Sequence, residues 1–247
     1  MNKQAANVLE LIEFFATHQR PASLAEIARH LGWPRSSTFK LLGTLTSRGY
    51  LYEPRARAGY YPAPLLAHLV NQIEQAQPVP KDVHELLESL VEETGETAVL
   101  AAASGSHAVF VDTVESPSSV RYTAHVGKRV PLHVTATGRA LLSQMDEKSR
   151  HALLKKAAYM AHTDTTLLSA EAVEQEIQVS LGRGWFRGNA EYSADLGGVA
   201  LALEIDERGF TLLVAGPTSR VGHRLPELAG ILQRHVAQYL RRHARAG

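Results

Sequence analysis

The sequence predicts an α+β protein in two parts, an N-terminal winged helix-turn-helix joined by a linker helix to a larger domain with a mostly antiparallel sheet. Three observations lead to this class. Two short amphipathic helices, separated by a glycine turn, precede two tyrosine-rich strand segments within residues 21–62. The segment 77–80 reads Gln-Pro-Val-Pro and ends a helical stretch, because proline cannot continue a helix. Beyond this segment, stretches whose apolar residues have helical spacing alternate with stretches that have strand spacing.

The N-terminal domain is expected to span residues 1–62 and to open with an amphipathic helix. Its apolar stripe consists of Val8, Leu9, Leu11, Ile12, Phe15 and Ala16. A second helix is expected to begin at Ser23, because Ser23 and Glu26 have the spacing of a capping box. It should end at Gly32, since glycine adopts the left-handed conformation without steric cost.

A third helix is expected to follow, with Pro34 in its first turn. Its inward stripe would be Thr38, Leu41, Leu42 and Leu45, and the outward face carries Arg35, Ser36, Ser37, Phe39, Lys40 and Thr44. Arginine can bind guanine with two hydrogen bonds, hydroxyl groups can bind bases or phosphates, and lysine attracts phosphate. This composition suits a recognition helix, although an ordinary helical hairpin with a solvated charged face would show the same helical period.

The next segments favour a wing over that alternative. Residues 50–52 and 59–61 are rich in tyrosine and favour strands, which puts Arg55 and Arg57 at the tip of a hairpin. Through Pro62 the chain has 8 Lys and Arg against 4 acidic residues, and the remainder has 18 against 21. The positive charge therefore gathers in the part that carries the motif, which predicts double-stranded operator DNA as a partner.

Residues 63–78 are expected to form a linker whose helix covers residues 64–76. The apolar face of that helix consists of Leu65, Leu66, Leu69, Val70 and Ile73. This face is exposed unless it packs against a domain or a second copy of itself. Because a DNA-binding protein gains affinity from two half-sites, a homodimer is expected.

The second domain is expected to cover residues 79–247 and to be α+β. Helices are predicted at 83–94, 136–144, 147–157, 170–183 and 225–242, and strands at 97–103, 107–115, 120–126, 199–206 and 210–215. Gly105-Ser106-His107 is interpreted as one hairpin turn and Glu207-Arg208-Gly209 as another. Consecutive hairpins favour an antiparallel sheet, which can hold a small ligand between one face and its covering loops.

Composition excludes several classes of protein and site. The 247 residues contain no cysteine, which excludes disulfides and thiolate sites. No run of about 18 apolar residues is present to span a membrane, and the N-terminus lacks a signal-peptide core, so we expect a cytoplasmic protein with no membrane partner. The 12 histidines show no metal-binding spacing, and we expect no metal and no cofactor.

No catalytic residue is expected either. Ser106 lies outside any Gly-x-Ser-x-Gly motif, and Glu191 with Asp195, four residues apart, is interpreted as surface charge. Two other features stay open at this stage: His133 is a ligand donor or a core histidine, and Gly197-Gly198 marks close ligand approach or a bulge. The alternative function is a small-molecule enzyme with an accessory helical N-terminal domain.

Four stretches resemble the IclR family of transcriptional regulators. They are residues 34–45, Gly49-Tyr50-Leu51 with Tyr61, residues 127–142, and Arg183-Gly184-Trp185 with Glu191 and Ala215-Gly216-Pro217. The last of these stretches resembles the remaining pocket elements of the family. The resemblance implies a ligand-responsive regulator, expected to be a repressor, with a GAF-like C-terminal domain and a dimeric or tetrameric assembly. It also implies a small organic or aromatic acid as effector.

By position in the family pattern, the resemblance implies an effector site of ten residues. They are Val130, His133, Thr135, Ala136, Thr137, Leu196, Gly197, Gly198, Leu213 and Ala215. A helix starting near Ala136 would offer free amides to a carboxylate without any arginine. The sequence departs from the family pattern at Lys40, where arginine is usual, and at Ala63-Pro64 after the wing. Leu213 and Ala215 also lack the hydroxyl groups of glyoxylate-type members, which favours an aromatic or larger acid.

Overall fold

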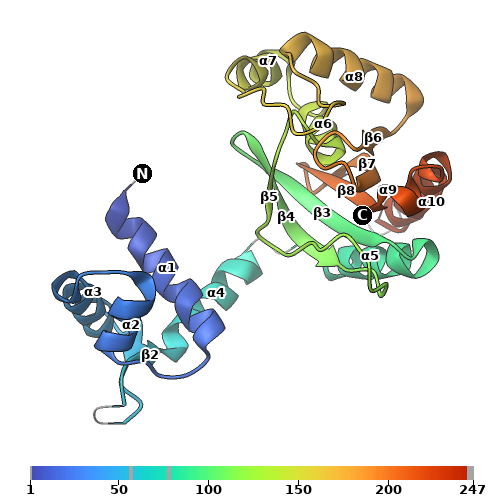
Figure 1. Cartoon of the computed structure of the whole chain (residues 1–247). Helices are drawn as coiled ribbons and strands as arrows, with labels where there is room; N and C mark the ends of the chain where they lie inside the picture. Colours follow the sequence, from blue (N-terminus) through green and yellow to red (C-terminus); the bar gives the residue numbers. More distant parts are fainter. Residues whose placement is uncertain (1, 56–57, 77–78, 244–247) are drawn as a thin grey trace. The chain divides into compact units, whose positions relative to one another are not determined.

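The computed structural model describes residues 2–55, 58–76 and 79–243. The chain divides into two compact units, Met1–Val79 and Pro80–Gly247, and each is described here by itself (Figure 1). The linker helix belongs to the first unit. No helix among the described residues is long and apolar enough to cross a membrane.

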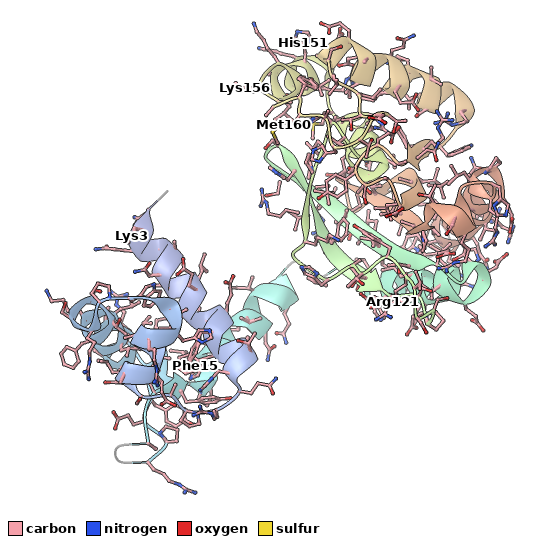
Figure 2. All side chains as sticks on the ribbon, in the orientation of Figure 1. Lys3, Phe15, Arg121, His151, Lys156 and Met160 are labelled. Carbon is pink, nitrogen blue, oxygen red and sulfur yellow. The ribbon has the colours of Figure 1, made fainter. Side chains whose placement is uncertain are left out.

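The first unit contains four helices and a two-stranded wing among its described residues. They are α1 (Lys3–His18), α2 (Leu24–Leu31), α3 (Arg35–Ser47), β1 (Leu51–Tyr52), β2 (Tyr61–Pro62) and α4 (Pro64–Ala76). A small core joins them, formed by Leu11, Phe14, Phe15, Ala22, Ile27, Leu42 and Leu51. Phe15, labelled in Figure 2, is 4% exposed and belongs to α1, so the N-terminal helix closes this core. Of the predicted stripe only Leu11 and Phe15 are buried, whereas Leu9 and Ile12 are 61% and 40% exposed.

The predicted start and end of α2 are confirmed. The Ser23 hydroxyl accepts a hydrogen bond from the Glu26 amide at 3.3 Å, and the Glu26 carboxylate accepts one from the Ser23 amide at 2.9 Å. Gly32 follows with a φ of 67°. Pro34 precedes α3 as its cap residue rather than lying in its first turn.

The wing is antiparallel, with Leu51 opposite Pro62. Tyr60 does not belong to β2 but pairs with Ala22, and each residue donates a backbone hydrogen bond to the other. Gly59 has a φ of 90°, and a Cβ atom there would lie 2.5 Å from the Ala22 backbone. Glycine is therefore required where the wing returns to the start of α2.

The second unit is a six-stranded antiparallel sheet with helices on both faces, which confirms the predicted α+β class. Its first elements are α5 (Lys81–Thr94), β3 (Thr97–Ser104), β4 (His107–Val114), β5 (Arg129–Pro131), α6 (Ala136–Leu142), α7 (Glu147–Lys155) and α8 (Ala170–Arg183). The others are β6 (Phe186–Asn189), β7 (Leu196–Ile205), β8 (Arg208–Pro217), α9 (Thr218–Val221) and α10 (Leu225–His243). The strand order is β5-β4-β3-β8-β7-β6.

The helices divide between the two faces of the sheet. α5 and α10 pack on one face and contact each other, whereas α6 packs on the opposite face (Figure 1). α8 contacts α6, α7 and the edge strand β6. The space between the sheet and the α6 layer holds the core cluster that includes Val99, Phe110 and Leu213.

The prediction of a strand at 120–126 was wrong. This segment is irregular because side chains, not a neighbouring strand, bind its backbone. The Thr97 hydroxyl donates to the Tyr122 carbonyl at 2.7 Å, and the Ala124 amide donates to the Glu115 carboxylate at 3.0 Å. The short elements β5, β6 and α9 were not predicted, since three or four residues carry too little periodicity to be recognised.

The two hairpin turns had different outcomes. Gly105 and Ser106 form the predicted β3–β4 turn, with Ser104 opposite His107. The β7–β8 turn lies one residue earlier than predicted, at Asp206 and Glu207, which have φ values of 49° and 59°. Both central residues of this turn adopt the left-handed backbone conformation although neither is glycine. Gly209 already belongs to β8.

Candidate functional site

The outward face of α3 is polar, cationic and exposed. Its members are Arg35, Ser36, Ser37, Phe39, Lys40 and Thr44, and all of them are exposed. The inward residues Thr38 and Leu42 are 1% and 0% exposed, which fixes the orientation of the helix. The predicted recognition residues therefore share one accessible surface.

Hydrogen bonding leaves this surface available to an outside partner. The Ser37 and Thr44 hydroxyl groups donate to backbone carbonyls at 2.9 Å and keep lone pairs for accepting. In the described part of the chain, Arg35 and Lys40 form no ion pair. Arg55 is exposed on the wing, whereas Arg57 lies outside the described residues.

A cavity of about 50 Å³ lies in the second unit between the α6 start, the β6–β7 region and the sheet. Nine of the ten residues in the predicted effector site line it: Val130, Thr135, Ala136, Thr137, Leu196, Gly197, Gly198, Leu213 and Ala215. Seven further residues complete the wall: Phe110, Tyr122, Val134, Gly188, Asn189, Glu191 and Tyr192. None of them was among the ten predicted residues, although the family resemblance included Glu191 among the pocket elements. Most of the wall is apolar.

His133 does not line this cavity. Its ring is 7% exposed and lies 5.0 Å from the Tyr159 ring, centroid to centroid. The Nε2 atom is buried and has no hydrogen-bond partner among the described residues. Burial lowers the pKa of His133, which disfavours the charged form. Of the two interpretations, the structure places His133 in the core.

The start of α6 lies at the cavity, which Thr135, Ala136 and Thr137 line. Thr135 caps the helix, its hydroxyl accepting from the Gly138 amide at 3.0 Å and donating to the Pro131 carbonyl at 3.0 Å. The amides of Ala136 and Thr137 belong to the first turn, where no intrahelical acceptor exists. A Cβ atom on Gly138 would lie 2.2 Å from the Leu132 carbonyl oxygen, so glycine lets α6 pack directly on the preceding backbone.

A buried ion pair includes one residue of the cavity wall, Glu191, and its partner Arg139. Arg139 is fully buried, and its Nη2 lies 2.9 Å from Oε2 of Glu191, which is 9% exposed. Arg139 also donates to the carbonyls of Val134 and Arg187, at 3.3 and 2.5 Å. The interpretation of Glu191 and Asp195 as paired surface charge was wrong, because Glu191 is buried in a non-helical segment and only Asp195 is exposed.

Gly197 and Gly198 line the cavity from β7, and no bulge interrupts the β7–β8 register. A Cβ atom on Gly198 would lie 2.7 Å from the Val214 carbonyl oxygen, and one on Gly197 would lie 2.9 Å from a methyl carbon of Val221. Close packing within the sheet and against α9 therefore requires both glycines.

An outer cleft of about 350 Å³ adjoins the cavity and shares Tyr122, Tyr192 and Leu196 with it. Lys128 lines the cleft, with its Nζ 4.4 Å from the centre of the Tyr122 ring. Arg121, labelled in Figure 2, lies on the irregular segment that precedes β5 in sequence, and it pairs with Glu115 at 2.8 Å. The cleft thus carries cationic side chains next to the aromatic residues of the cavity wall.

Nothing in the described ranges suggests a metal centre. Within residues 2–55, 58–76 and 79–243, no group of three or more His, Asp or Glu side chains is placed to hold a metal ion. The polar residues that line the cavity include Thr135, Thr137, Asn189 and Glu191, and Arg139 balances the charge of the Glu191 carboxylate.

Comparison with known proteins covers both units. Residues 4–55 match the family described as IclR helix-turn-helix domain, and residues 72–240 match Bacterial transcriptional regulator IclR C-terminal. The chain is 29% identical over 230 residues to the acetate operon repressor of Salmonella typhimurium, covering 91% of this chain and 84% of that protein. It is 28% identical over 218 residues to the transcriptional repressor IclR of Escherichia coli, covering 86% and 79%.

Solved structures show the same fold at lower identity. The IclR of Thermotoga maritima has a TM-score of 0.76 at 20% identity, covering 98% of this chain and 99% of that one. An IclR homolog from Microbacterium hydrocarbonoxydans, complexed with 4-hydroxybenzoate, has a TM-score of 0.71 at 18% identity, covering 95% and 96%.

Proposed function

The chain belongs to the IclR family of bacterial transcriptional regulators, and on this premise we propose that it is a repressor whose operator binding responds to an organic acid. The family consists of regulators rather than enzymes, and its helix-turn-helix domain binds DNA. The finer proposal has three parts: the residues that bind the operator, the class of effector, and the assembly. A protein with this function works in the cytoplasm, where the DNA is.

The exposed face of α3 is the observation that carries the DNA-binding part. Arg35 and Lys40, which form no ion pair within the described residues, lie on a helix whose other side is fixed in the core. We assign base contacts to Arg35, Ser36, Ser37, Phe39 and Thr44, and phosphate contacts to Lys40, Arg55 and Arg57. A helix held in this way can enter the major groove while the wing contacts the neighbouring backbone.

The cavity supports an aromatic or larger organic acid as effector. A carboxylate there would accept hydrogen bonds from the Ala136 and Thr137 amides, at the positive end of α6. An apolar body would contact Phe110 and Leu213 in the wall. The complex of a structural relative with 4-hydroxybenzoate makes that compound a reasonable first probe.

Exposed apolar residues of the first unit support a homo-oligomer. Leu9 on α1 is 61% exposed, and Val70 and Ile73 on α4 are 59% and 73% exposed. Between these helices lies an apolar groove of about 170 Å³ lined by residues that include Ile12 and Leu66. Pairing through α1 and α4 would cover these side chains and bring two α3 helices to a two-half-site operator, as a dimer or as a tetramer of two dimers.

The test is an anisotropy titration of the full chain on duplex DNA from beside its own gene, at two salt concentrations, with and without 4-hydroxybenzoate, benzoate and glyoxylate. We expect saturable, salt-sensitive binding that an aromatic acid changes and glyoxylate does not. Absence of DNA binding would overturn the proposal that the protein is a DNA-binding regulator. DNA binding that only glyoxylate alters would overturn the effector class alone.

A further inference from the structure

Phe39 is an exposed aromatic residue in the middle of the cationic face of α3. Its side chain is 62% exposed, while the apolar residues on the opposite side of the helix are buried in the core of the first unit. Its neighbours one turn earlier are Arg35 and Ser36, both exposed. The fold of this unit therefore gives no reason for an aromatic ring at this position.

Gly43 is an independent anomaly on the same surface. It lies inside α3, where glycine disfavours a helix relative to alanine. Its φ is not positive, and a Cβ atom built there would meet no atom of the described chain within 4 Å. Neither its backbone conformation nor its packing against these residues requires glycine, in contrast to Gly59 and Gly138.

The two anomalies adjoin each other. Gly43 follows Phe39 by four residues and Lys40 by three, and residues at these spacings are neighbours on a helix surface. The missing side chain keeps the helix surface low beside Phe39, and no side-chain atom of Phe39 lies within 4 Å of the position that a Cβ atom would take. An exposed aromatic side chain, an exposed cation and a position without a side chain thus adjoin one another on this face of α3.

We propose that Phe39 reads a thymine by contact with its C5-methyl group, and that Gly43 lets the edge of the major groove approach α3 closely enough for this contact. The inference rests on the proposed DNA-binding function and adds a base preference to it. In the major groove the thymine methyl is the one apolar group that a base pair presents, and phenylalanine is among the side chains that contact it.

Charge identifies DNA rather than another protein as the occupant of this surface. Arg35 and Lys40 flank Phe39 without an ion pair among the described residues, and the first unit carries the positive excess of the chain. An apolar protein partner would leave both cations buried without compensation. A groove edge instead supplies phosphates for the cations and a methyl group for the ring.

The first experiment removes single methyl groups from the DNA. The full chain selects duplexes from a random library, and each thymine of a selected duplex is then replaced in turn by deoxyuridine. We expect at least one replacement to weaken binding by the wild-type chain about fourfold, the effect of one methylene-sized apolar contact. Phe39→Ala should bind the parent duplex about as weakly as the wild-type chain binds the deoxyuridine duplex. Replacing the same thymine by deoxyuridine should not weaken the binding of Phe39→Ala any further.

The controls separate the possible failures. Met160→Ala changes a side chain in the second unit that is 64% exposed, and it should keep full sensitivity to deoxyuridine. The inference is overturned if every deoxyuridine duplex binds as tightly as its parent, or if Phe39→Ala keeps the wild-type sensitivity. Failure to select any duplex overturns the DNA-binding function itself.

The second experiment tests Gly43. Gly43→Ala should raise the thermal midpoint, because alanine favours the helix, and yet weaken DNA binding by about fivefold or more, the effect of one extra carbon in a packed contact. Gly230→Ala is the matched control, because Gly230 also lies inside a helix and a Cβ atom there would meet no described atom within 4 Å. It should leave DNA affinity unchanged. Wild-type affinity in Gly43→Ala would refute close approach at this residue.

Discussion

Replacing Glu191 with glutamine should strongly destabilise the second unit while changing almost nothing in its shape. The glutamine oxygen can still accept from Arg139, but the guanidinium would lose the carboxylate that neutralises it. Arg139 is fully buried, so water cannot solvate its guanidinium once the carboxylate is gone. Removing one partner of a buried pair costs about 3–5 kcal/mol, and we expect about 3 kcal/mol because the carbonyls of Val134 and Arg187 remain as acceptors.

The assay is thermal and urea unfolding followed by circular dichroism. For a domain of this size about 3 kcal/mol corresponds to a fall of roughly 6–12 °C in Tm. The double change Arg139→Met with Glu191→Gln should be less destabilised than Glu191→Gln alone, because it removes the uncompensated charge. A loss below about 1 kcal/mol for Glu191→Gln, or a double variant as unstable as the sum of the single ones, would refute this reasoning.

Four further outcomes are expected. Lys40→Ala should weaken binding to all DNA sequences and lower by about 1 the slope of log affinity against log salt concentration. Arg35→Ala should instead relax the preference at one base pair. Equal salt slopes for Lys40→Ala and the wild type would exclude a phosphate contact by Lys40. Because burial lowers the pKa of His133, the unfolded chain binds a proton that the folded chain does not as pH falls below the ordinary value of 6.5. Stability should therefore decrease below that pH, and His133→Gln should flatten the decrease in urea unfolding at pH 7.5 and 5.5. Gly138→Ala should lower stability by about 1–3 kcal/mol in the same unfolding assay, since the added carbon meets the Leu132 backbone. Ser23→Ala should cost about 1 kcal/mol through the lost cap, measured as a lower Tm of the first unit.

The first unit was the more predictable of the two. Its signals are local: the capping box at Ser23, the glycine at position 32 and the helical stripe through Leu42 each specify structure within a few residues. The second unit also has clear local signals for its long helices and hairpins. Its errors occur where contacts distant in sequence decide the structure, as at 120–126, whose backbone is held by Thr97 and Glu115.

The candidate cavity shows the same division. Thr135 lies in the continuous stretch 127–142 that resembles the family, and Gly198 was assigned by its position in the family pattern. The structure brings both residues to the cavity. The family resemblance included Glu191 among the pocket elements, but its spacing from Asp195 led to its interpretation as surface charge. That interpretation was wrong because nothing in the local sequence reveals that Arg139, 52 residues away, is buried beside Glu191. Tyr122 and Tyr192 gave no sequence signal, since each lies in an irregular segment whose path depends on the rest of the unit.

Three side chains line both the cavity and the outer cleft: Tyr122, Tyr192 and Leu196. Their position affects the rate at which a bound molecule leaves as well as its affinity. A molecule that left the cavity by way of the cleft would pass the side chains that line both, and packed aromatic rings move more slowly than exposed side chains. Equilibrium occupancy depends only on the bound and free states, whereas the departure rate depends on this passage. Two effectors of equal Kd would then differ in residence time, and a bulky one would stay bound through a brief fall in its supply.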